Sequence, residues 1–210
     1  MTTIGGQLTV INSGTLYRGM PSFCPADHKL AAEAVQQAKG RVIGVVHPLF
    51  CQPNIHNPSL ITDNRLMRPF ITPQRYNAYL TKLTQFLRTS IEPLLVFIPE
   101  GRQAEIVAWV NELKRPGLAM TIATEAISPQ PVFPNSDNPH IAWRRLTGML
   151  MDIGVAEVIF VGEKYYRIAS DRAGCVYSAF MMTHMTSRIS VELIDTLTFP
   201  NVHILGYEEE

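Results

Sequence analysis

Short runs of aliphatic and β-branched residues alternate along the chain with longer amphipathic stretches. The four most apolar runs, residues 41–46, 94–98, 118–123 and 157–161, are nearly continuous, as expected for strands buried on both faces. Three weaker strand candidates, residues 7–11, 189–193 and 202–205, are expected nearer the edges of a sheet. Such runs alternating with helices predict βαβ units and a parallel sheet.

The stretches between these runs carry helix start and stop signals. Proline or a short polar residue stands at the predicted helix starts, and glycine or proline follows most of the predicted ends. We expect Thr72 and Asn138 to cap two of the helices and Ser170 or Asp171 to cap the last. The predicted helices cover residues 25–40, 73–87, 101–113, 139–153 and 174–185.

The order of these elements predicts the fold class. We expect an α/β protein: a three-layer sandwich built on a mainly parallel, Rossmann-like sheet of five or six strands, with helices on both faces. The weaker runs are compatible with an antiparallel strand at one end of the sheet. The 210 residues suit a single domain, residues 1–210.

Two connections, residues 47–72 and 124–138, are much longer than the usual loops of an α/β domain. Both follow the carboxyl end of a predicted strand, and open parallel sheets bind ligands at that edge. Seven prolines lie in these loops and would stiffen them. We therefore expect the loops to form walls of a ligand site; a subunit contact or plain surface loops are the alternatives.

Polar residues directly after the strands are the first candidates for chemistry. Their side chains would converge at one sheet edge, where carboxylates and a histidine are suited to proton transfer and basic groups to holding an anion. The alternative is the ordinary polarity of residues that leave a buried strand. The expected acid–base residues are His47, Glu100 and Glu163, and the expected ligand-binding residues are Arg102, Glu125, Tyr165 and Arg167.

The start of the last predicted helix is a second candidate. Asp171, Arg172, Gly174 and Cys175 lie where backbone N–H groups and the helix dipole favour a bound anion. No glycine-rich phosphate fingerprint accompanies them, and an ordinary capped helix explains the segment equally well.

Cys175 is also a candidate nucleophile, because a helix start stabilises a thiolate. The stretch GCVYSAF resembles the cysteine and valine that open a helix in isochorismatase-like cysteine hydrolases. That family places an aspartate at the end of its first strand, where this chain has His47, so the activity is not carried over. A buried structural cysteine is the alternative.

Composition narrows the expected function. The formal net charge is zero, with 18 basic and 18 acidic residues, which argues against a general nucleic-acid binder and against attraction to an anionic membrane. Only 17% of residues are charged, where about 25% is typical, and this favours burial in a homo-oligomer. The three cysteines are too few and too widely spaced for a disulfide framework, and the sequence shows no signal peptide and no long apolar span. We therefore expect a cytoplasmic protein.

These observations lead to two functional hypotheses. The first is an enzyme, a hydrolase or transferase in class, that acts on a small anionic metabolite such as a nucleotide or phosphorylated compound bound at the carboxyl ends of the strands. The alternative is a non-catalytic module that binds or senses a small ligand as a homo-oligomer. Histidine and cysteine spacings match no metal motif, so no metal site is expected, and the sequence identifies no cofactor.

Overall fold

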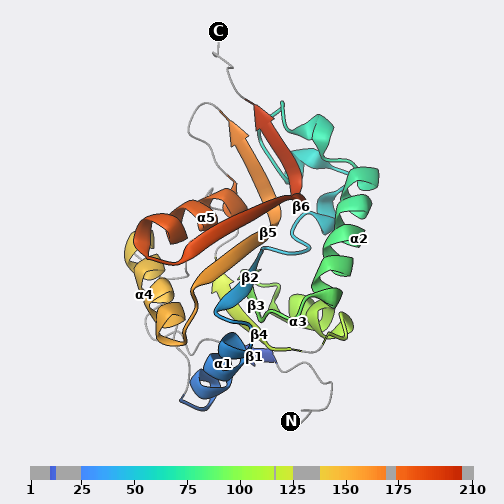
Figure 1. The fold of residues 1–210 in the computed structure, drawn as a ribbon. Helices are drawn as coiled ribbons and strands as arrows, with labels where there is room; N and C mark the ends of the chain where they lie inside the picture. The colour runs from blue at the N-terminus through green and yellow to red at the C-terminus, as the bar shows by residue number, and fades with distance from the viewer. Residues whose placement is uncertain (1–9, 13–24, 116, 125–137, 169–173, 205–210) are drawn as a thin grey trace.

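The computed structural model describes residues 10–12, 25–115, 117–124, 138–168 and 174–204. Its six strands form one sheet in the order β1-β4-β3-β2-β5-β6, and every neighbouring pair is parallel (Figure 1). Fully apolar stretches such as β3 require cover on both faces, which a parallel α/β sheet provides. The strands are β1 (Val10–Asn12), β2 (Arg41–Val46), β3 (Leu94–Pro99), β4 (Ala119–Thr124), β5 (Glu157–Ile168) and β6 (Ser190–Ile204).

Helices cover both faces of the sheet, so the predicted three-layer α/β fold is confirmed. The helices α1, α4 and α5 pack on one face, and α2 and α3 pack on the other. Two predicted caps are present, because the Thr72 side chain accepts a hydrogen bond from the Arg75 N–H and Asn138 accepts from the N–H of His140. The helices are α1 (Pro25–Gln37), α2 (Pro73–Thr89), α3 (Gln103–Glu112), α4 (Pro139–Asp152) and α5 (Cys175–Thr186).

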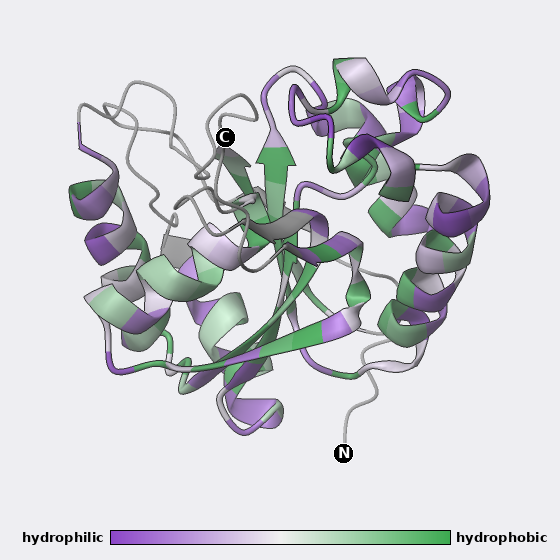
Figure 2. Cartoon of the chain, turned by 90° about the horizontal axis from the view of Figure 1, so that it is seen from above, coloured by the Kyte–Doolittle hydropathy of each residue, from purple (hydrophilic) through white to green (hydrophobic). Residues whose placement is uncertain are grey.

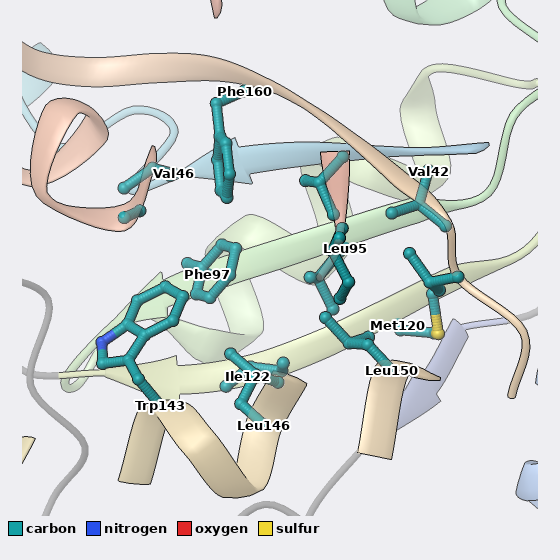
Figure 3. Close-up of a cluster of buried hydrophobic side chains, with 14 of the residues drawn as sticks. Val42, Val46, Leu95, Phe97, Met120, Ile122, Trp143, Leu146, Leu150 and Phe160 are labelled. Carbon is teal, nitrogen blue, oxygen red and sulfur yellow. The ribbon is translucent and has the colours of Figure 1, made fainter. Parts of the chain in front are cut away.

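The hydrophobic pattern explains this layering. Hydrophobic residues concentrate on the strands, whereas the surrounding helices carry both hydrophobic and hydrophilic stretches (Figure 2). On the α4 face, Trp143, Leu146 and Leu150 point from the helix toward the strands (Figure 3). The Trp143 ring stacks on Phe97 of β3, with ring centroids 5.6 Å apart. Burial of this apolar stripe is what fixes α4 to the sheet.

The structure corrects three strand predictions. No described strand is antiparallel, β5 continues to Ile168 instead of ending at Val161, and the runs 189–193 and 202–205 belong to the single strand β6. Between those two runs the register shifts from Leu193 opposite Phe160 to Thr198 opposite Gly162, so residues 194–197 form an irregularity within one strand. In Figure 1, β5 and β6 extend together beyond the other strands.

The long connection 47–72 is a packed layer on the α2 face. It contains three short 3₁₀ turns, η1 (Gln52–Asn54), η2 (Pro58–Leu60) and η3 (Arg68–Phe70), each with a proline near its start. Its buried side chains join the core of that face, among them Leu49, Ile55 and Ile71. Most of the other long connection, residues 125–137, lies outside the described residues. In the described ranges, no helix combines the length and apolar character needed to span a bilayer.

Candidate functional site

The strand order has its topological switch point between β2 and β5. From β2 the chain moves through β3 to β4 in one direction, and from β5 it moves to β6 in the other. Connections therefore leave the carboxyl ends of β2 and β5 in opposite directions, and ligands of open α/β sheets bind at such a switch point. His47 follows β2 directly, and Glu163 and Lys164 lie in β5 just past its pairing with β2.

Close contact between the two strands marks this point. Gly162 pairs with Val46 and has a φ of +128°, a conformation that only glycine adopts readily. A Cβ atom placed on Gly162 would lie 2.2 Å from the Val46 carbonyl oxygen. Beyond this contact, Lys164 also has a positive φ, +58°. The unusual backbone conformations of Gly162 and Lys164 thus lie where the ends of β2 and β5 come together, at the switch point.

His47 is completely buried at the switch point. Its N–H donates to the Phe97 carbonyl at 2.9 Å, which holds the residue in an unusual positive-φ conformation of +47°. Its Nε2 lies 2.6 Å from Thr124 Oγ1, whereas Nδ1 has no hydrogen-bond partner among the described residues. Burial, with a further contribution from the charge of Lys164, lowers the pKa of His47 to about 3. The imidazole is therefore neutral at physiological pH.

Glu163 is also completely buried and binds the connection 47–72. Its Oε1 accepts hydrogen bonds from the Leu49 N–H and the Tyr76 hydroxyl, both at 2.9 Å, and its Oε2 accepts from the Cys51 N–H at 2.6 Å. Burial raises the pKa of Glu163 to about 7, although these donors oppose the shift. This expected acid–base residue therefore anchors the turn formed by residues 49–51.

Arg102 and Lys164 contact the same turn from other sides. Arg102 Nη1 donates to the Leu49 carbonyl at 2.7 Å, while the rest of its guanidinium forms a two-point ion pair with Glu105. The Lys164 ammonium lies 4.9 Å from the centre of the Phe50 ring. Leu49 keeps a φ of +62° because its N–H and its carbonyl are both held. Arg102 is thus bonded both to the turn and to Glu105.

The remaining expected site residues lie on other elements or outside the described residues. Glu100 is exposed in the turn after β3. Tyr165 and Arg167 lie in the extended end of β5, where only the backbone is described, opposite Pro200 and His203 of β6. Glu125, Asp171 and Arg172 lie outside the described residues.

The start of α5 differs from the prediction. Gly174 occupies the cap position, in place of Ser170 or Asp171, and provides no capping side chain. Gly174 and Cys175 are both buried. Burial raises the pKa of the Cys175 thiol to about 11, although the nearby Lys164 charge opposes this shift. The thiol is therefore protonated at neutral pH, contrary to the thiolate expected at a helix start.

The two buried groups predict opposite pH dependences of stability. The pKa of Glu163 is raised above its usual 4.5, so the pH-dependent part of its contribution is full below pH 4.5 and is lost as the pH rises to about 7, while its hydrogen bonds to the turn 49–51 and Tyr76 remain. The pKa of His47 is lowered from 6.5, so its contribution is full above pH 6.5 and is lost as the pH falls toward 3. One pKa unit corresponds to about 1.4 kcal/mol, so over the full pH range we expect a change of about 3 kcal/mol for Glu163 and about 5 kcal/mol for His47.

Urea unfolding of wild type, Glu163→Gln and His47→Gln between pH 4.5 and 6.5 measures these contributions. The stability difference between wild type and Glu163→Gln should decrease as pH rises, and the difference between wild type and His47→Gln should increase. Slopes of the same sign for both differences would contradict this assignment.

A hollow of about 460 Å³ lies at the opposite edge of the sheet. It is lined by the ends of α1 and α4, including Lys39 and Asp152, and by the glycines that follow the two helices. These residues precede β2 and β5, so the hollow does not include the switch point. Within the described ranges, no three His, Cys, Asp or Glu side chains are arranged to hold a metal ion.

Three further residues gain a specific role from the structure. Thr124 and Lys164 belong to the polar residues that the sequence places at the strand ends, although they were not among the expected acid–base or ligand-binding residues. Tyr76 lies in α2, 87 positions from Glu163, and nothing in the sequence connects the two. Comparisons of the chain with protein-family models, curated protein sequences and solved structures find no match.

Proposed function

We propose that the protein is an enzyme that acts on a small anionic metabolite at the switch point between β2 and β5, with His47 as the proton-accepting residue. The observation that carries the proposal is the Nδ1 atom of His47, a buried ring nitrogen at the switch point with no partner among the described residues. An unpaired buried polar atom costs about 1 to 3 kcal/mol. A bound ligand that pairs with this nitrogen would remove that cost.

Lys164 supports the anionic character of the ligand. Its positive charge lowers the pKa values of both His47 and Cys175, so it acts on both side chains. The α5 N-terminus adds the positive end of a helix dipole. An anion bound here would raise the pKa of His47 and make the neutral imidazole a stronger base.

A thermal-shift screen of nucleotides, sugar phosphates and small dicarboxylates tests ligand binding. A compound present at 100 times its dissociation constant should add about 2.7 kcal/mol of stability to the wild type. Lys164→Gln should lose most of this gain. Lys82→Gln removes the same charge from an exposed position on α2 and should retain it. Equal gains in all three proteins, or none, would contradict the anion site.

Turnover of the compound found by this screen tests the catalytic role. His47→Gln should lower kcat/KM by about 10² to 10⁴, the usual contribution of a positioned base. Steady-state kinetics should show this loss mainly in kcat. A variant that turns over the compound at the wild-type rate would exclude His47 as the base.

One observation favours a second candidate, a non-catalytic binding or sensing module. The Glu163 oxygens are already bonded to the turn 49–51, and Glu100 is exposed, so neither expected carboxylate is arranged beside His47 as a partner acid. Binding of a stabilising anion without turnover of any related compound would support this alternative.

A further inference from the structure

The ends of three neighbouring strands meet at the His47 ring. The His47 N–H is bonded to Phe97 of β3, and the His47 ring reaches Thr124 at the end of β4. The same Thr124 hydroxyl oxygen, Oγ1, also lies 3.3 Å from the carbonyl oxygen of Ile98 in β3. Thr124 and His47 are both fully buried, and Ile98 is almost so. The ring orientation is thus determined by a hydrogen-bonded path inside the protein.

This path distinguishes the two neutral forms of the imidazole. A threonine hydroxyl has one hydrogen, and a carbonyl oxygen only accepts. If Thr124 donates to the Ile98 carbonyl, its oxygen accepts from a protonated Nε2 of His47, and both contacts are hydrogen bonds. If Thr124 donates to Nε2, the contact with Ile98 is lost and Nδ1 carries a buried hydrogen without an acceptor among the described residues. The first arrangement satisfies one more buried group and is favoured.

We infer that Thr124 is a positioning residue that holds the proton of His47 on Nε2, leaving Nδ1 as a hydrogen-bond acceptor, so that the ligand presents a hydroxyl or amine to this atom. The role of Thr124 follows from the hydrogen-bond geometry alone, and the class of ligand rests on the proposed function. The substrate class is narrowed to anionic compounds that carry a hydrogen-bond donor beside the charged group.

Nuclear magnetic resonance of protein with ¹⁵N-labelled histidine tests the role of Thr124 without any ligand. His47→Gln identifies the His47 signals among those of the six histidines. At pH 7 the wild type should show a protonated Nε2 and an unprotonated Nδ1. Thr124→Ser, which retains the hydroxyl, should give the same pattern.

Thr124→Val removes the acceptor of the Nε2 hydrogen. The two ring nitrogen shifts should then move toward each other as the ring exchanges between both forms, and protection of the Nε2 hydrogen from exchange should be lost. Thr147→Val is the matched control: Thr147 is buried and donates to the Trp143 carbonyl within α4, and its loss should leave the His47 signals unchanged. A protonated Nδ1 in the wild type, or a wild-type spectrum in Thr124→Val, would overturn the inference.

A matched pair of probes tests the ligand class. Glycerol 3-phosphate and n-propyl phosphate carry the same anion, and only the first has hydroxyl groups. Isothermal titration should show about tenfold tighter binding of glycerol 3-phosphate to the wild type, the usual effect of one hydrogen bond. The preference should disappear in His47→Gln. Tighter binding of n-propyl phosphate would overturn the donor assignment, whereas binding of neither probe counts against the proposed phosphate ligand and leaves the tautomer result intact.

Discussion

Replacing Glu163 with alanine should lower the free energy of unfolding by about 3 to 6 kcal/mol. The carboxylate accepts hydrogen bonds from two backbone N–H groups and the Tyr76 hydroxyl, and each buried donor left without an acceptor costs about 1 to 3 kcal/mol. A loss of this size is a large part of the total stability of a typical domain. Urea unfolding followed by circular dichroism at pH 7 measures it.

Two other variants separate this anchoring role from a general effect of losing a glutamate. Tyr76→Phe removes a single hydrogen bond to Glu163 and should cost about 1 kcal/mol. Glu100→Ala removes an exposed carboxylate and should change stability by less than about 0.5 kcal/mol. Similar losses in Glu163→Ala and Glu100→Ala would show that the contacts of Glu163 with the turn contribute little.

Gly162→Ala should be the most damaging small substitution in the described sheet. The new Cβ would lie 2.2 Å from the Val46 carbonyl oxygen and 2.7 Å from the Val46 nitrogen, and backbone atoms cannot move away without separating β2 from β5. The φ of +128° adds backbone strain for any residue with a side chain. We expect a loss of at least about 4 kcal/mol, measured by urea unfolding.

Two other glycines provide graded controls. Gly44→Ala brings a Cβ to 2.8 Å from the Phe160 ring, a side chain that has some freedom to shift, so a smaller loss is expected. Gly148 lies inside α4 with open space around it, and Gly148→Ala should raise stability by about 0.5 to 1 kcal/mol. If all three variants had similar stability, close packing of β2 on β5 would not be what requires Gly162.

These predictions all concern the end of β2 and its neighbours, where structural and chemical roles are divided among adjacent residues. Glu163, Arg102 and Gly162 hold the turn 49–51 and the two strands together. His47 keeps a buried nitrogen that no described group satisfies, and Lys164 provides positive charge nearby. The proposed chemistry therefore depends on His47 and Lys164, and a loss of activity in Glu163 variants has to be compared with their loss of stability.

The sequence by itself determined the layer architecture and the positions of the central strands. Continuous apolar runs are stable only when both of their faces are buried, so the run itself indicates a central strand. Caps such as Thr72 and Asn138 act within one turn of chain, so the helix starts are also determined locally. The same strand-end rule correctly placed His47 and Glu163 at the carboxyl edge of the sheet.

Only the tertiary structure decided what each of these residues does. The partners of Glu163 are Leu49, Cys51 and Tyr76, which are 87 to 114 positions away, and His47 meets Thr124 from a strand 77 positions later. The continuity of β6 was equally hidden, because pairing with β5 overrides the turn-like residues within it. Hydrogen bonds and burial between distant segments depend on strand order and register, and a local pattern of residues carries no information about either.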